Sequence, residues 1–403
     1  MFLPAMPTSS IWGSIWGSSA SLSAASSVDS MMARLQVLSP ITRSAGEAFR
    51  LMQGWMRGLM VVLLAGLLSG FLIADPALAQ SGSEGSSRTP PASGRSGTKT
   101  MGDLTRFNTS IVRIDTRIPD DATSAKSLGT ARVGTGILLD DKTILTIGYL
   151  AVEADSVMVT TASGKRIPAS VAGYDHATGF GLVRAAVPLD GSPMALGDSD
   201  KVTERQRVLT LGHGEPEATE LLVVSRKVFT GGWEYLIERP IYTFPPVNNW
   251  SGAALISEDG KLIAVGSLIV EDAASSQRSV PGNLWVPINL LKPIMPELLA
   301  RGRRSDDVPP WLGITTESVR GYLMVVRVAP QGPADAAGVT PGDIVIGVAG
   351  EKVADQAEFY RKLWKTGPAG TPIPLRLFKD GDVRELTIKS IDRADFLRKA
   401  SGI

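Results

Sequence analysis

Ser251 stands in a loop whose residue types could support nucleophilic catalysis. It follows Asn249 and Trp250, precedes Gly252, and leads into a small-residue apolar strand over residues 253–256. A glycine directly after a serine lets a substrate backbone approach closely, because it carries no side chain. A serine hydroxyl becomes a nucleophile when a base accepts its proton and a third group orients that base. Since Ser-Gly-Ala also occurs in ordinary turns, the hypothesis depends on finding these partners.

The composition excludes several other kinds of chemistry. The 403 residues include no cysteine and only two histidines, His176 and His213. Disulfides, thiol nucleophiles and thiolate metal sites are therefore ruled out. A zinc site would have to rely on carboxylates instead of cysteines, and no carboxylates are spaced for that. We expect no metal and no cofactor. The formal net charge of +1 gives no reason to expect nucleic acid as a partner.

The N-terminal part of the chain has the features of an export segment. Residues 1–56 are serine-rich and show no domain-like pattern, so we expect a non-structural extension. Residues 57–79 combine Arg57, an uninterrupted apolar run and the ending Ala77-Leu78-Ala79, which is typical of a cleaved signal peptide. Residues 80–102 contain Ser, Gly, Pro and Thr without core-forming residues and are predicted to be a disordered linker.

The start of translation and the fate of the signal decide the location. We expect the start downstream of Met1, where Met52 or Met56 would give a conventional signal peptide. Cleavage would release an exported protein that begins near Gln80. The alternative is an uncleaved signal anchor that leaves the protein attached to the membrane.

Residues 103–301 have the pattern of an all-β domain. Short apolar runs alternate with glycine, proline and Asp-Gly turn signals, and long helical periodicity is missing. Examples of these runs are residues 110–114, 134–139, 156–160, 180–184, 207–211, 221–225 and 262–266. About 190 residues of this pattern fit two small barrels better than one.

The order of motifs in this region resembles the trypsin-like protease domain of the HtrA/Deg family. The motifs are Gly134-Thr-Gly-Ile-Leu-Leu139, Thr143-Ile-Leu-Thr146, Gly173-Tyr-Asp175, Leu196-Gly-Asp-Ser199, Leu211-Gly212 and the loop of Ser251. The resemblance implies a two-barrel, trypsin-like (chymotrypsin-fold) domain.

Carried over position by position, the resemblance leaves the serine without its partners. The family's histidine stands three residues after the threonine of the Leu-Thr pair, and here that position is Tyr149. The family's aspartate would lie four residues after Asp175, and here that position is Gly179. A tyrosine, with a reference pKa of about 10, accepts a proton poorly at neutral pH. A glycine has no side chain with which to orient a base. The domain is therefore predicted to be a pseudoprotease with Ser251 in the nucleophile position.

The oxyanion loop differs from the family as well. The N–H groups at Asn249 and Ser251 would form the oxyanion hole, but Asn249 replaces a glycine. Asparagine tolerates left-handed backbone angles better than most residues, which would preserve the loop. Trp250 is large enough to fill or cap the substrate cleft.

Four side chains remain as substitute bases for Ser251. His176 lies in a turn, where a histidine is usually solvated, and the resemblance places His213 remote from the serine. Lys142 and Lys165 would have to form a Ser–Lys pair, and no spacing supports either. None of the four is a strong candidate.

A second unit is predicted over residues 310–393, after a charged hinge at 302–309. The strings Ala337-Gly-Val339 and Pro341-Gly-Asp-Ile-Val345 resemble a PDZ domain, which has an α+β fold. Short helices are expected over residues 334–337, ending at Gly338, and over residues 356–364. The tail, residues 394–403, contains a short helix-like stretch over residues 395–399 and no recognisable motif.

PDZ domains bind an extended peptide along a sheet edge and capture its terminal carboxylate with backbone N–H groups. By resemblance, Leu312, Gly313 and Ile314 form this carboxylate loop. Phe359 and Leu363 either line the side-chain pocket or belong to the core, and the sequence leaves both interpretations open. The partners implied are peptides, or the C-termini of unfolded or client proteins. The family also implies a homotrimer.

Three functions are compatible with these observations. The first is an exported, inactive protease homologue that binds peptides or unfolded proteins in envelope protein quality control. The second is an active serine endopeptidase that activates Ser251 in an unorthodox way. The third is a structural partner whose PDZ domain recognises one fixed C-terminus.

Overall fold

The structure is a computed structural model that describes residues 105–274 and 279–400. These residues fall in one of the chain's two units, which runs from Gly94 to Ile403. The extension, signal and linker predicted over residues 1–102 lie outside the described residues. Within the described ranges, every helix is too short or too polar to span a membrane.

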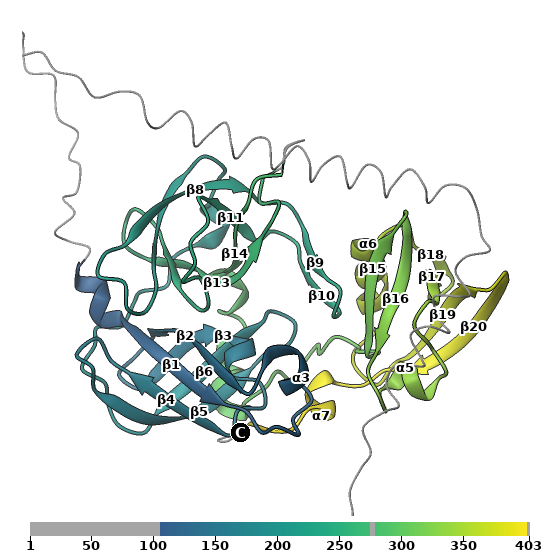
Figure 1. The fold of residues 1–403 in the computed structure, drawn as a ribbon, viewed down its shortest axis with the longest axis horizontal. Helices are drawn as coiled ribbons and strands as arrows, with labels where there is room; N and C mark the ends of the chain where they lie inside the picture. Colours follow the sequence, from purple (N-terminus) through teal and green to yellow (C-terminus); the bar gives the residue numbers. More distant parts are fainter. Residues whose placement is uncertain (1–104, 275–278, 401–403) are drawn as a thin grey trace, which may run out of the picture. The chain divides into compact units, whose positions relative to one another are not determined.

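The first barrel is closed by six antiparallel strands in the order β1-β2-β3-β6-β5-β4 (Figure 1). The strands are β1 (Ile111–Arg117), β2 (Ala131–Leu138), β3 (Thr143–Ile147), β4 (Ser156–Thr160), β5 (Arg166–Tyr174) and β6 (Phe180–Ala185). The short helices around them are η2 (Thr105–Ser110), α3 (Ala125–Leu128) and η3 (Gly148–Leu150). Strand β1 shows why the sequence folds this way: Val112 and Ile114 are buried, whereas Arg113 between them is exposed.

The second barrel also has six strands, in the order β11-β14-β13-β12-β7-β8. They are β7 (Arg207–Leu211), β8 (Thr219–Ser225), β11 (Ile241–Phe244), β12 (Ala254–Ile256), β13 (Leu262–Val270) and β14 (Gly282–Pro287). A separate hairpin, β9 (Phe229–Gly231) and β10 (Tyr235–Ile237), lies between β8 and β11 in the chain. The remaining helices are η4 (Ser199–Lys201), η5 (Ile288–Leu290) and α4 (Met295–Arg301). The prediction of two barrels is confirmed.

One apolar cluster joins the two barrels and places the candidate site. It contains Leu145 and Ile147 from β3 of the first barrel, and Ala254 and Ile256 from β12 of the second. All three side chains of β12 are buried, which explains the run of small and apolar residues after Ser251. The serine loop is therefore fixed where the barrels pack together.

The C-terminal domain is a six-stranded sheet with two helices, as the PDZ resemblance predicts. Its strands are β15 (Ile314–Val319), β16 (Tyr322–Val328), β17 (Ile344–Val348), β18 (Glu351–Lys352), β19 (Pro372–Lys379) and β20 (Asp382–Lys389), and its helices are α5 (Pro333–Ala336) and α6 (Gln356–Lys365). Asp355 caps α6 by accepting a hydrogen bond from the N–H of Glu358. Both expected helices are present, within one residue of the expected bounds.

The tail differs from the expectation. Its helix, α7, spans Arg393–Phe396 instead of residues 395–399. The residues that follow return to the first barrel, where the N–H of Arg398 donates to Glu153 Oε1 at 3.0 Å and Ala400 is buried in the barrel core. The tail therefore connects the C-terminal domain to the first barrel. The sequence did not predict this contact, because the tail is charged and carries no recognisable motif.

We predict that Leu255→Ala lowers the free energy of unfolding by about 2–5 kcal/mol, because it leaves a cavity in a fully buried strand. Leu222→Ala in the same barrel is the matched control, since Leu222 is 39% exposed. Denaturant unfolding of the two variants measures the difference. Equal losses would contradict the position of β12 in the core.

Candidate active site and carboxylate loop

Ser251 lies against β2 of the first barrel. The N–H of Thr135 donates to the backbone oxygen of Ser251 at 2.8 Å, and the hydroxyl of Thr146 donates to the backbone oxygen of Thr135 at 2.7 Å. A Cβ atom at Gly134 would lie 2.7 Å from Ser251 Oγ, so this glycine makes room for the hydroxyl. Gly252 has a φ of 74°, and its own Cβ would lie 2.2 Å from the Thr135 oxygen. Only glycine fits at both positions.

The Tyr149 phenol is the hydrogen-bond partner of the serine hydroxyl. Tyr149 Oη donates to Ser251 Oγ over 2.6 Å. Burial raises the pKa of Tyr149 above its ordinary value, so the phenol stays protonated at neutral pH. The serine oxygen thus accepts a hydrogen bond from the group that would have to remove its proton. Within the described ranges no imidazole, amine or carboxylate is hydrogen-bonded to this oxygen.

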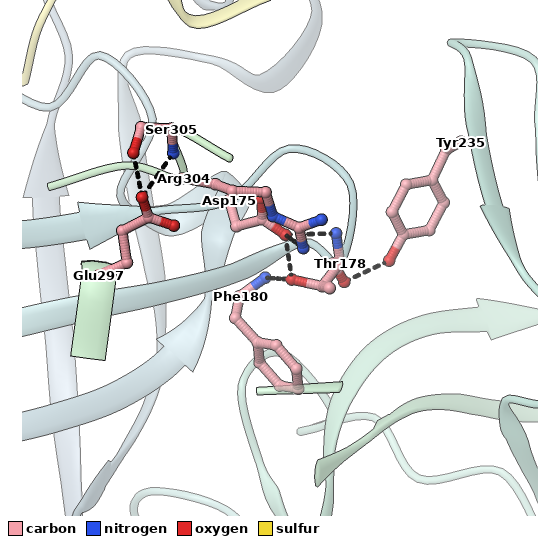
Figure 2. A network of polar contacts seen from close by, with 7 residues as sticks. All are labelled: Asp175, Thr178, Phe180, Tyr235, Glu297, Arg304 and Ser305. Atoms are coloured by element: carbon pink, nitrogen blue, oxygen red, sulfur yellow. Dashed lines mark hydrogen bonds and ion pairs between the residues drawn. The ribbon is translucent and has the colours of Figure 1, made fainter. Parts of the chain in front are cut away.

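The phenol of Tyr235 occupies the place beside Gly179. A Cβ at Gly179, which has a φ of 79°, would lie 2.8 Å from Tyr235 Oη. That hydroxyl donates to the backbone oxygen of Thr178 at 2.7 Å, as Figure 2 shows. The nearby carboxylate of Asp175 is bound to the Thr178 hydroxyl at 2.6 Å and to Arg304 at 3.1 Å. The space beside Gly179 is therefore occupied by a second phenol, and Asp175 is committed to an ion pair.

Asn249 and Trp250, the two residues before the serine, make different contacts. Asn249 does not adopt a left-handed backbone, so the expectation that its tolerance of such angles preserves the loop is wrong. Its side chain instead donates to the backbone oxygen of His213 at 2.6 Å. The ring of Trp250 packs edge-on against Tyr149, with ring centroids 6.2 Å apart. This contact helps to hold the phenol beside Ser251.

Within the described residues, neither histidine is hydrogen-bonded to the Ser251 hydroxyl. His213 lies closer to the serine loop than the resemblance implies, because its Nδ1 atom is 3.0 Å from the hydroxyl of Thr135. Burial lowers its pKa. For His176 we expected a solvated ring, but the ring packs against Tyr174 with centroids 4.2 Å apart. Burial lowers the pKa of His176 well below its ordinary value.

The two lysines considered as bases lie in turns of the first barrel. Lys142 is in the β2–β3 turn, where its N–H donates to Asp140. Lys165 is exposed in the β4–β5 turn. Across the described part of the chain, neither is hydrogen-bonded to Ser251. The same residues contain no group of three or more His, Asp or Glu that could hold a metal ion.

The expected carboxylate loop holds a carboxylate from the chain itself. The N–H groups of Gly313 and Ile314 donate to Glu234 Oε1 at 2.7 and 2.9 Å, and that of Leu312 donates to Glu234 Oε2 at 2.9 Å. Gly313 has a φ of 83°, a conformation that glycine adopts at little cost and that turns the loop. The loop therefore has the donors that carboxylate capture requires.

Phe359 and Leu363 lie on the inner face of α6. Both side chains are completely buried in the core cluster of the C-terminal domain. Their neighbour Tyr360 is also buried, and its hydroxyl accepts a hydrogen bond from the N–H of Glu234 at 3.2 Å. The geometry thus favours the core interpretation of Phe359 and Leu363.

Comparisons with known proteins agree with the two-domain fold. A model of the trypsin-like peptidase domain matches residues 134–265, and a model of the PDZ domain matches residues 310–390. The chain has HtrA-type architecture: a trypsin-like peptidase domain followed by a PDZ domain.

Several HtrA-type proteins are similar to the chain over both domains. A probable periplasmic serine protease do/HhoA-like protein of Haemophilus influenzae is 26% identical over 277 residues, covering 64% of this chain and 58% of the relative. The serine protease Do-like HtrA of Bacillus subtilis is 23% identical over 288 residues, covering 64% and 62%. The chain thus spans little more than half the length of these curated relatives.

The solved structures similar to the chain include an HtrA-type protease and a serine endoprotease. The HtrA-type protease AlgW with a tripeptide shares 19% identity, with a TM-score of 0.46 over 73% of this chain and 96% of its own. A serine endoprotease from Yersinia pestis shares 22% identity, with a TM-score of 0.46 over 73% and 99%.

Sequence reasoning missed two residues of the PDZ and peptidase sites, Tyr235 and Glu234. Both come from the β9–β10 hairpin, which has no counterpart among the motifs that carry the HtrA resemblance. A charged residue in a short Gly-Gly turn is normally solvated, so nothing in the sequence indicated that Glu234 is only 6% exposed.

We predict that Gly179→Ala is more destabilising than Gly164→Ala. Both glycines have left-handed backbones, which cost an alanine about 1–2 kcal/mol, but only Gly179 faces a phenol, since nothing lies within 4 Å of a Cβ at Gly164. The contact should add about 1 kcal/mol or more to the loss of unfolding free energy. Thermal or denaturant unfolding of both variants checks this. Equal losses would contradict the position of Tyr235.

Proposed function

We propose that the chain is an exported, catalytically inactive HtrA-type protease homologue that binds peptides or unfolded proteins through its PDZ domain. The observation that carries the proposal is the 2.6 Å hydrogen bond from Tyr149 Oη to Ser251 Oγ. In a working serine protease the base accepts the serine proton. Here the group in that position donates, and burial raises its pKa, so the protonated phenol persists.

The magnitude of the expected loss supports inactivity. Removing one member of a catalytic triad leaves roughly 10³–10⁴-fold catalysis over water, far below the intact enzyme. This chain lacks both the base and the acid, and Tyr235 fills the place beside Gly179 where the acid would stand. The retained serine and its loop then serve the fold, through the contacts of Ser251 and Gly252 with β2.

The PDZ domain supplies the proposed binding activity. Three convergent N–H groups, from Leu312, Gly313 and Ile314, suit a carboxylate. The match of residues 310–390 to a PDZ-domain model supports this role. The ligand class is therefore the C-terminal carboxylate of a peptide or of an unfolded client. By resemblance, homotrimeric assembly is part of the proposal.

The location and the cellular role are also proposed. Relatives from Haemophilus influenzae and Halomonas elongata are named as periplasmic proteases. Together with the signal peptide predicted over residues 57–79, these names support a periplasmic protein that serves envelope protein quality control. An uncleaved signal would instead anchor it to the membrane, facing the periplasm.

We predict that the purified chain does not cleave unfolded casein faster than its Ser251→Ala variant. The reason is that no described group accepts the serine proton. Release of fluorescent peptides from labelled casein measures both rates, with trypsin as the positive control for the substrate. Cleavage that disappears in Ser251→Ala would establish the alternative, an active endopeptidase with unorthodox activation.

We also predict that Tyr149→His does not restore proteolysis. The new imidazole would lack an orienting acid, because Gly179 has no side chain and Tyr235 occupies the adjacent space. Loss of that acid alone costs about 10⁴-fold in a trypsin-like enzyme, so casein cleavage by the variant should stay at the wild-type background. A rise of about 100-fold or more would show that a histidine alone activates this serine and that the site is otherwise intact.

A further inference from the structure

The β9–β10 hairpin occupies the PDZ carboxylate loop in the way that a peptide would. The Glu234 carboxylate uses both oxygens to accept the three loop N–H groups, at 2.7–2.9 Å. The backbone oxygen of Gly232 accepts the N–H of Thr316 on β15 at 2.9 Å. Leu236 packs against the apolar cluster of the PDZ domain. A carboxylate, an edge-strand hydrogen bond and an apolar side chain are the features by which PDZ domains hold a C-terminus.

Further contacts from the PDZ side fix the hairpin. The Tyr360 hydroxyl donates to the backbone oxygen of Gly231 at 2.9 Å. Arg393 donates to the backbone oxygen of Trp233 at 3.1 Å. An exposed, bidentate ion pair joins the guanidinium of Arg361 on α6 to both carboxylate oxygens of Glu238, at 2.8 and 2.7 Å. The hairpin tip is thus held on its backbone as well as through its carboxylate.

Glu234 has an unusual conformation and setting for a charged residue. It is the last of three turn residues and has a φ of 58°, a position that usually takes glycine. Its side chain is 6% exposed. Burial raises its pKa to about 7, although the loop N–H groups and Arg393 act in the opposite direction. Docking this carboxylate therefore carries a desolvation cost that offsets part of the free energy of its hydrogen bonds.

We propose that the β9–β10 hairpin is an internal ligand of the PDZ domain, and that a peptide C-terminus binds only by displacing Glu234. The proposal rests on the peptide-binding function proposed above and specifies how that site is regulated. The free protein is then in a closed state, in which the N–H groups of the carboxylate loop donate to Glu234 of the same chain. The apparent affinity for peptides is then reduced by the fraction of molecules in the open state.

Two variants of the full chain test the proposal. Glu234→Gln replaces one acceptor with an NH₂ group that faces the loop N–H groups. Gly232→Ala keeps the carboxylate but places a Cβ 2.6 Å from the backbone oxygen of Thr316. The control is Glu258→Gln, at an exposed turn of the second barrel. Unfolding curves confirm that each variant is folded.

Peptide binding and amide hydrogen exchange are the two readouts. The probe is a fluorescein-labelled octapeptide library with apolar residues at the last three positions and a free carboxylate, and an amidated library is its control. Both hairpin variants should bind the free-carboxylate library about tenfold or more tightly than the wild type and Glu258→Gln. The amides of Leu312, Gly313 and Ile314 should exchange faster in Glu234→Gln without any peptide.

The outcomes separate this proposal from the proposed function. Equal library affinity in the wild type and both hairpin variants would overturn the internal ligand while leaving peptide binding intact, and unchanged amide exchange would also overturn it. Faster exchange in Glu234→Gln with no library binding by any protein would support the internal ligand. In that case the peptide-binding function is the part that fails.

Discussion

The direction of one hydrogen bond determines what the cleft can do. Tyr149 Oη donates to Ser251 Oγ, and both residues lie close to strands that are fixed by burial in the core. Tyr149 lies on η3 directly after the buried strand β3, and Ser251 lies three residues before the start of the buried strand β12. The apolar cluster shared by the barrels holds these strands together. The same packing that would align a catalytic pair in an active relative here keeps a protonated phenol against the serine.

Two neighbouring residues of one hairpin link the altered cleft to the PDZ domain. Tyr235 fills the space beside Gly179 in the peptidase domain, and Glu234 fills the carboxylate loop of the PDZ domain. A glycine in the acid position is compatible with this hairpin because a side chain there would meet the phenol. The phenol beside Gly179 and the carboxylate in the PDZ loop thus come from one structural element.

The fold could be predicted from the sequence because its signals are local. Alternating burial along strands such as β1, turn residues, and the glycines near the PDZ helices all act within a few residues. Tyr149 and Gly179 could be singled out for the same reason, since both follow recognisable motifs at fixed spacing. The contacts of the hairpin could not be predicted, because Tyr235 and Thr178 are 57 positions apart in the chain, and Glu234 and Leu312 are 78 positions apart. Such contacts depend on tertiary packing, and the hairpin that makes them has no motif of its own.

The most direct test of the account is whether the Ser251 hydroxyl is nucleophilic. A fluorophosphonate probe forms a covalent bond only with a serine whose proton is being removed, and intact-mass spectrometry counts the molecules that are labelled. We predict no labelling of Ser251 at neutral pH, because its oxygen accepts a hydrogen bond from the protonated phenol of Tyr149 and no base removes its own proton. Stoichiometric labelling that is lost in Ser251→Ala would contradict it.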